Sequence, residues 1–363
     1  MKRKLFLIKV LLSIVLLNTQ CTVKAPEDEA VEKSRSLVAG FVKKNRIPGL
    51  SVSVSKDGTM VWSEGFGYGN VEQQVKVDPS ATRFRIGSVS KTLTATAIGL
   101  LHENNKMDID LPVRHYVPSF PQKRWEINIR QIAGHIAGIR HYRGQEYLSD
   151  KRYATVTEGL VMFQDDSLLF EPGTDYTYSS YGWNLISAAV ETASGTEFLQ
   201  FMKQNVFEPV KMTRTVPDYG EVLTPFRTGF YALSEDSTWF NAPSVDNSYK
   251  WAGGGFLSTT EDLVKFGNAI LTGGLLNKAT TELLFTPLTI SNGKSTDYGL
   301  GWRKYEGNGG GEWYGHSGGS VGGTAIFILS PKEKMVVAIL SNLSEVGYDR
   351  LHFTIAENFM NYR

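Results

Sequence analysis

The feature that most limits the fold is the position of the strand-like segments, which lie near both ends of the 363-residue chain. Residues 50–55 alternate between apolar side chains and serine, residues 57–58 are Asp-Gly, and residues 60–63 are again strand-like. This pattern predicts a hairpin with an Asp-Gly turn. Two further apolar runs, residues 324–329 and 335–340, are joined by a short polar segment and predict a second hairpin.

Helical patterns fill the chain between these hairpins and flank them. Apolar residues recur at helical spacing in five segments: 37–44, 88–103, 181–194, 260–271 and 348–360. We therefore predict an α/β (α+β) fold in which both hairpins share one antiparallel sheet, with the terminal helices packed against it and a helical lobe inserted. The expected boundaries are a sheet lobe at about residues 36–85 and 295–363, and a helical lobe at about 86–294.

Composition excludes several classes of protein. Hydrophobic residues are 41% and charged residues 21% of the chain, which is ordinary for a globular protein and not for a disordered one. The net charge of +1 argues against a nucleic-acid partner. One cysteine forms no intrachain disulfide or Cys-rich zinc site, and the six histidines include no pair at zinc-ligand spacing. We predict neither a metal nor any other cofactor.

The N-terminus carries the pattern of a targeting segment. Residues 2–4 are Lys-Arg-Lys, and residues 10–17 are apolar apart from Ser13. This run is too short to cross a bilayer as a helix and is typical of a secretory signal. Residues 1–21 are therefore predicted to be a signal segment, which would place the protein in the bacterial cell envelope, in the periplasm or outside the cell.

The single cysteine, Cys21, follows the apolar run at the position where bacterial lipoproteins are acylated. We predict Cys21 as a lipidation site, which would attach the protein to the membrane by its N-terminus alone. The alternative is a plain secretory signal with an incidental cysteine. Residues 22–35 are polar and acidic and predict a tether, so that residues 36–363 form the working domain.

A serine nucleophile needs a base, and a neutral lysine one helical turn away can supply it. The pattern Ser-x-x-Lys occurs at Ser53, Ser88 and Ser291. Ser53 falls in the alternating strand, and Ser291 falls in a turn with no helix behind it. Only Ser88 starts a long helical pattern, which places it on one helix face with Lys91. Ser88 is therefore the predicted nucleophile, and the alternative is an N-cap serine followed by a solvated lysine.

A second serine lies in a different motif. Residues 315–319 read Gly-His-Ser-Gly-Gly and satisfy Gly-x-Ser-x-Gly, with Ser317 at the centre. A nucleophile elbow needs a strand, a sharp turn and then a helix. Here a strand-like segment follows instead, so we reject the elbow.

Tyr178 and His316 are the other candidates for chemistry. Tyr178 lies on a loop before a helical pattern, where a tyrosine can act as a phenolate base if a cation lowers its pKa. The alternative for Tyr178 is a packing aromatic. His316 precedes a strand together with Ser317, Gly318 and Gly319, and such small residues let backbone N–H groups approach a substrate carbonyl.

In this order, Ser88-Val89-Ser90-Lys91, Tyr178-Ser179-Ser180 and His316-Ser317-Gly318 resemble the three motifs of the serine β-lactamase-like and penicillin-binding family. Within it, residues 48–69, 84–118, 135–142 and 246–259 look most like the mitochondrial serine β-lactamase-like members from animals. The resemblance covers residues 36–360. It implies a helical lobe packed on an antiparallel sheet, with the active site between them.

The resemblance also implies a role for each matching residue. Ser88 would be acylated, Lys91 would activate it, and Tyr178 would relay a proton to the leaving group. His316 would line the cleft with Ser180, Ser317, Gly318 and Gly319 at the substrate. The backbone N–H groups of Ser88 and Gly319 would form the oxyanion hole.

Two positions depart from the penicillin-hydrolysing pattern, because Ser180 replaces the usual Asn and His316 replaces a common lysine. Both departures favour peptidase or esterase chemistry. We predict a serine hydrolase acting through an acyl-enzyme on an amide or ester, foremost a peptidase. The alternatives are an esterase, a weak β-lactamase or D-Ala-D-Ala-type carboxypeptidase, or a non-catalytic penicillin-binding or assembly module. The expected partner is a peptide or a small amide or ester substrate.

Overall fold

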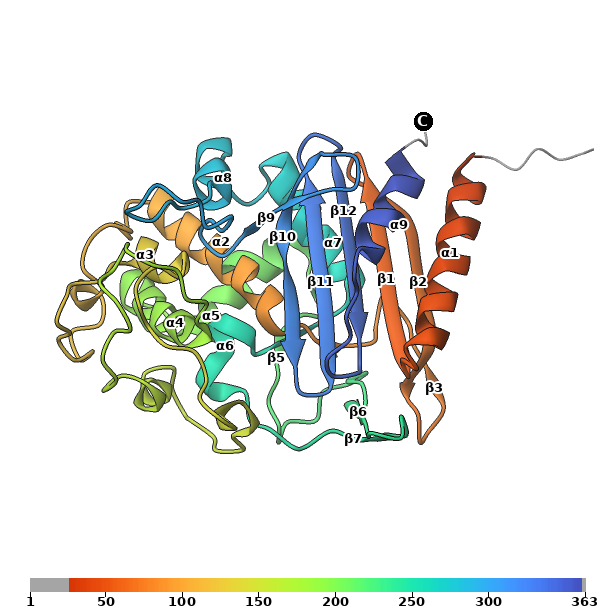
Figure 1. The fold of residues 1–363 in the computed structure, drawn as a ribbon, viewed down its shortest axis with the longest axis horizontal. Helices are drawn as coiled ribbons and strands as arrows, with labels where there is room; N and C mark the ends of the chain where they lie inside the picture. Colours follow the sequence, from red (N-terminus) through yellow and green to blue (C-terminus); the bar gives the residue numbers. More distant parts are fainter. Residues whose placement is uncertain (1–25, 361–363) are drawn as a thin grey trace, which may run out of the picture.

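The computed structural model describes residues 26–360, and its centre is a seven-stranded antiparallel sheet. The strand order is β3-β2-β1-β12-β11-β10-β9, so the first and last hairpins meet through β1 (Gly49–Lys56) and β12 (Met335–Ser341). The predicted fold class and the shared sheet are thus confirmed (Figure 1). The first hairpin turns at Asp57 and Gly58, which have φ angles of 50° and 80°, as a two-residue turn of this kind requires.

The alternation in β1 has a direct structural cause. Leu50, Val52 and Val54 point to one face of the sheet and join the core under the terminal helices α1 (Pro26–Lys44) and α9 (Leu351–Met360). The serines between them point to the other face, where Ser51 and Ser53 lie 2.7 Å from the hydroxyl of Thr260. Thr260 begins α7 (Thr260–Thr272), which packs on β1 and β12.

The N-terminal boundary differs from the prediction of a tether over residues 22–35. Helix α1 begins at Pro26 and packs along the sheet beside α9 (Figure 1). Its buried face carries small side chains, Ala30 and Ser34, one turn apart and followed by Val38. Because few large apolar residues lie on this face, the helical periodicity is weak, and the acidic residues around it led to the prediction of a tether.

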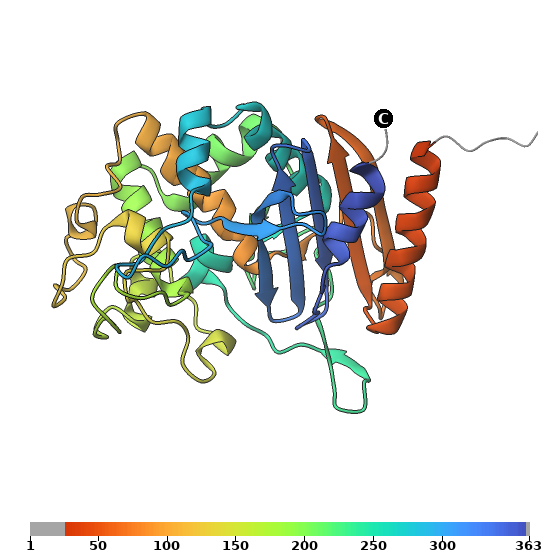
Figure 2. The same cartoon turned by 45° about the horizontal axis from the view of Figure 1, so that its top comes forward.

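The middle of the chain forms the helical lobe, whose long helices α2 (Ser90–Glu103) and α4 (Ser180–Ser194) lie on the opposite side of the sheet from α1 (Figure 1). A large apolar core joins this lobe to the sheet. A hairpin of β6 (Tyr231–Leu233) and β7 (Trp239–Asn241) projects away from the body (Figure 2). Within residues 26–360, no helix is long and apolar enough to cross a membrane.

The remaining strands are β2 (Thr59–Asn70), β3 (Val75–Lys76), β4 (Phe84–Arg85), β5 (Val216–Pro217), β8 (Phe256–Ser258), β9 (Arg303–Glu306), β10 (Glu312–Ser320) and β11 (Gly323–Ser330). The remaining α-helices are α3 (Ile129–Ala133), α5 (Phe198–Phe201), α6 (Trp251–Gly254) and α8 (Lys278–Phe285). Short 3-10 helices lie at Gly87–Val89, Val113–His115, Glu146–Leu148, Glu158–Met162, Glu208–Val210 and Ser248–Lys250, and a π-helix at Met202–Phe207.

Candidate active site

Ser88 lies in the 3-10 helix Gly87–Val89, directly before α2, where the helical lobe meets β10. The side chain of Lys91, one turn later, points back to it, with Nζ 3.1 Å from Ser88 Oγ. The pairing predicted from the sequence spacing is therefore present.

Lys91 is fully buried, and its amine makes three polar contacts. Besides Ser88, Nζ lies 3.1 Å from Ser180 Oγ and donates to the carbonyl oxygen of Gly253 at 2.6 Å. Burial, assisted by the charge of Lys250, holds the pKa of Lys91 well below its ordinary value of 10.5. Within the described residues no carboxylate forms an ion pair with this amine. The neutral form, which can accept a proton from serine, is therefore favoured.

Tyr178 contacts the same serine, since its hydroxyl donates to Ser88 Oγ at 2.6 Å. Burial raises the pKa of Tyr178, and the hydrogen bond with Ser88 opposes this only in part. The resting tyrosine is thus a neutral phenol that donates a proton. The sequence allowed a phenolate base if a cation lowered this pKa, but burial outweighs the hydrogen bonds that favour the charged form.

The backbone around Ser88 approaches β10 so closely that side chains would not fit. A Cβ atom on Gly318 would lie 2.0 Å from the carbonyl oxygen of Ile86, and one on Gly87 would lie 2.5 Å from that of Gly319. Ser320 and Gly323 close the two-residue turn between β10 and β11. Opposed residues in an antiparallel ladder alternate between pairs that exchange hydrogen bonds and pairs that do not. The pair after the turn, Gly319 and Thr324, is of the second kind, so the N–H of Gly319 points away from β11. Two backbone donors, those of Ser88 and Gly319, therefore lie on facing segments.

His316 lies on β10 near Tyr178 but does not contact Ser88. Its Nε2 is 2.8 Å from the hydroxyl of Tyr298, and its ring centroid is 5.9 Å from that of Tyr178. Burial, assisted by Lys91, lowers the pKa of His316 to about 3. The imidazole is therefore neutral at physiological pH and cannot replace the charge of the lysine common at this position.

The other sequence candidates divide into two groups. Ser180 and Gly319 line a cavity of about 290 Å³ that opens at Ser88. Gly318 packs behind it against Ile86, and Ser317 is an exposed residue in the middle of β10. Since Ser317 lies within a strand with no helix after it, the nucleophile-elbow context is absent, as expected.

Several cavity residues were not among the sequence candidates, and Lys250 and His141 are two of them. Lys250 is 5% exposed and lines the cavity, and burial, followed by the charge of Arg85, lowers its pKa to about 7. His141 lines the cavity too and accepts from the N–H of Ser180 at Nδ1, 3.2 Å away. Both lie in segments that carried the family resemblance, but no local motif marks either one.

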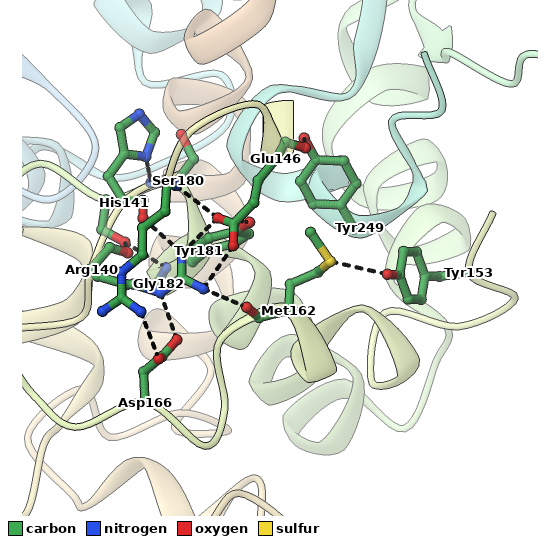
Figure 3. A network of polar contacts seen from close by, with 12 residues as sticks. Arg140, His141, Glu146, Tyr153, Met162, Asp166, Ser180, Tyr181, Gly182 and Tyr249 are labelled. Carbon is green, nitrogen blue, oxygen red and sulfur yellow. Dashed lines mark hydrogen bonds and ion pairs between the residues drawn. The ribbon is translucent and has the colours of Figure 1, made fainter. Parts of the chain in front are cut away.

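A polar network fixes the loop that carries His141 (Figure 3). Arg140, only 6% exposed, binds Glu146 at 2.6 Å and Asp166 at 2.5 Å through its guanidinium. Its own carbonyl oxygen accepts a hydrogen bond from Ser179 Oγ at 2.6 Å. The loop is thereby tied to the start of α4, next to Tyr178 and Ser180.

Comparisons with known proteins agree with this geometry. The sequence profile of the Beta-lactamase family matches residues 35–357. The mitochondrial serine beta-lactamase-like protein LACTB of Homo sapiens is 32% identical, covering 91% of this chain and 80% of that protein. Penicillin-binding protein 4* of Bacillus subtilis is 27% identical, covering 85% of this chain and 72% of that protein. The octameric penicillin-binding protein homologue from Pyrococcus abyssi has a TM-score of 0.79 at 26% identity, covering 90% of this chain and 76% of that one.

These comparisons overturn the predicted location. The LACTB proteins of human, mouse and cattle, each 32% identical to this chain, are mitochondrial, which contradicts a bacterial envelope or secreted location. The prediction relied on the charge and hydropathy of residues 1–21 alone. A targeting segment is a short pattern that does not depend on the fold of the rest of the chain. The signal segment and Cys21 lie outside the described residues.

Proposed function

Because the chain belongs to the beta-lactamase family of serine hydrolases, we propose that it cleaves an amide or ester bond through an acyl-enzyme on Ser88. The observation that carries this proposal is the convergence of two groups, the amine of Lys91 and the hydroxyl of Tyr178, on one oxygen. Ser88 Oγ lies 3.1 Å from the amine of Lys91 and 2.6 Å from the hydroxyl of Tyr178. A nucleophile placed between a base and an acid is the arrangement that acyl transfer requires.

In the first step, Ser88 Oγ attacks the substrate carbonyl carbon and its proton passes to the neutral amine of Lys91. The carbonyl oxygen becomes an oxyanion, and the N–H groups of Ser88 and Gly319 stabilise it. Each such donor contributes about 3–4 kcal/mol to transition-state stabilisation in comparable enzymes.

In the second step, the bond to the leaving group breaks and Tyr178 donates its proton to the departing atom. The proton on Lys91 then restores the tyrosine, so that no net charge is left in the site. Water hydrolyses the acyl-enzyme by the reverse sequence: Tyr178 first passes its proton to Lys91, the phenolate then accepts a proton from the attacking water, and Lys91 returns its proton to Ser88 Oγ.

We infer that the bond cleaved is an amide, as in a peptidase. An amine departs only when protonated, whereas an alcohol or phenol departs more readily without help. Tyr178 is a neutral acid in contact with Ser88, and its raised pKa keeps its proton available. His316, being neutral and packed beside Tyr178 and Tyr298, is proposed as a positioning residue that orients the tyrosine.

The experiment is a hydrolysis screen with the parent and the Ser88→Ala variant. The substrates are D- and L-aminoacyl and peptidyl arylamides, aryl esters and a chromogenic cephalosporin. Turnover of arylamides that disappears in the folded variant is the expected result. Esters alone as substrates would refute the peptidase proposal, and equal activity in both proteins would refute Ser88 as the nucleophile. Activity in neither protein would favour a non-catalytic member of the family.

A further inference from the structure

We propose that Lys250 and Ser320 form an anion-binding subsite that selects substrates with a carboxylate on the acyl side of the cleaved bond. This inference rests on the proposed function, because it assigns the substrate class of the same active site. Four observations carry it: the shared cavity, the surroundings of Lys250, an unpartnered hydroxyl and the position of Tyr178.

Lys250 lies in the wall of the cavity that holds Ser88, which also includes Ser180 and Gly319. Its ammonium group lies 5.6 Å from the ring centroid of Tyr142 and 5.2 Å from that of Tyr249. Aromatic faces at these distances stabilise a cation. These rings offset part of the burial that lowers the pKa of Lys250 to about 7, and an anion bound beside the amine would favour its charged form further.

No carboxylate within residues 26–360 forms an ion pair with Lys250. The buried acid on this side, Asp218, is already bound by Arg85 at 2.6 Å and by the amide of Asn247 at 2.7 Å. Asp246 accepts from the backbone N–H of Ser248. Both acids favour the charged form of Lys250 through their charge, but neither contacts its amine and burial still lowers its pKa. An anionic ligand in direct contact would reduce the cost of this buried charge.

The second polar group is the hydroxyl of Ser320, at the end of β10. It lines the same cavity, and its buried oxygen makes no hydrogen bond within the described residues. Buried hydroxyls are usually partnered, so this one can donate to a ligand. An ammonium group and a hydroxyl both donate hydrogen bonds, which are what a carboxylate accepts.

The position of Tyr178 shows which part of the substrate this cavity receives. Tyr178 contacts Ser88 but does not line the cavity. In the proposed mechanism the leaving group must lie beside Tyr178, so the acyl group occupies the cavity. Glu345 also borders the cavity, but it is exposed and its charge is screened by water.

The test compares isosteric substrates that differ only in charge. Acetyl-aspartyl and acetyl-glutamyl arylamides are paired with the asparaginyl and glutaminyl arylamides. The parent, Lys250→Met, Lys250→Arg and the exposed-lysine control Lys151→Met are assayed. We expect the parent to prefer the acids by about 10- to 100-fold in kcat/KM, as a charge-assisted hydrogen bond would give. Lys250→Met should lose this preference, Lys250→Arg should keep it, and Lys151→Met should change it by less than about twofold.

Similar rates in the parent for the substrates with acidic side chains and those with carboxamide side chains would overturn the subsite, whether or not the Lys250 variants fold. An equal loss on both substrates in folded Lys250→Met would also overturn it, because it would indicate a structural role. A third measurement separates the subsite from the proposed function: calorimetric binding of the α-amides of N-acetylaspartate and N-acetylasparagine, which differ only in the side-chain carboxylate, to Ser88→Ala. Selective binding of the acid supports the subsite even if no substrate is turned over, and equal binding refutes it.

Discussion

Gly318→Ala tests whether the close contact between β10 and the segment before α2 builds the oxyanion hole. The new Cβ would lie 2.0 Å from the carbonyl oxygen of Ile86 and 3.2 Å from the nitrogen of Ser88. Relief of the first contact requires the two segments to separate by more than about 1 Å, and a shift of this size in a catalytic group costs about 100-fold in rate. The expected cost in stability is about 1–3 kcal/mol, as for other overpacked sites.

Gly40→Ala in helix α1 is the control for an added methyl group, because a Cβ at that position meets no atom within 4 Å and lies outside the site. The assay is the second-order rate of labelling by a fluorophosphonate, which reacts at an activated serine through a similar charged intermediate. We expect Gly318→Ala to be labelled about 100-fold more slowly and Gly40→Ala to react like the parent. The reasoning would be refuted if folded Gly318→Ala kept the parent rate, or if both variants slowed equally.

Three further predictions follow from the same site. Lys91→Met should lower the labelling rate by about 100-fold or more, and an unchanged rate in this variant would exclude Lys91 as the base. In the parent the labelling rate should rise with pH to a plateau reached well below pH 10.5, because the lowered pKa of Lys91 favours its reactive neutral amine. Tyr178→Phe should slow arylamide hydrolysis by about 100-fold and slow aryl esters much less, and equal losses would exclude the tyrosine as the acid for the leaving group. The pKa of His316 is lowered to about 3 from 6.5, so between these pH values the unfolded chain binds more protons and the free energy of unfolding falls as the pH drops. His316 alone should account for a loss of about 2 kcal/mol between neutral pH and pH 5. Chemical denaturation of His316→Gln should show a loss smaller by that amount, and an equal loss would contradict a buried neutral imidazole.

Local patterns in the sequence were sufficient to predict much of the fold. The alternation in residues 50–55 reflects two faces with different neighbours, apolar helices on one side and the hydroxyl of Thr260 on the other. The spacing of Ser88 and Lys91 is also local, since one helical turn fixes their contact. Such features depend on a few neighbouring residues and can be read directly from the chain.

The charge states and the cavity could not be predicted in this way. Lys250 reaches the site from far along the chain, and its pKa of about 7 depends on burial beside Arg85. His316 was expected to stand in place of a lysine without supplying its fixed charge, but the burial that lowers the pKa of the imidazole to about 3 could not be predicted. Whether Tyr178 is a phenolate depended on a cation that the sequence did not identify, and burial favours the neutral form. In each case the environment, which only the folded chain creates, determines the chemistry.

The central claim is that Ser88 is the activated nucleophile. Its most direct test is peptide mapping by mass spectrometry after reaction of residues 22–363 with a fluorophosphonate, with Ser88→Ala treated in parallel. The account predicts a single adduct on Ser88 and none in the variant. An adduct on Ser317, or labelling of the variant to the same extent, would contradict it.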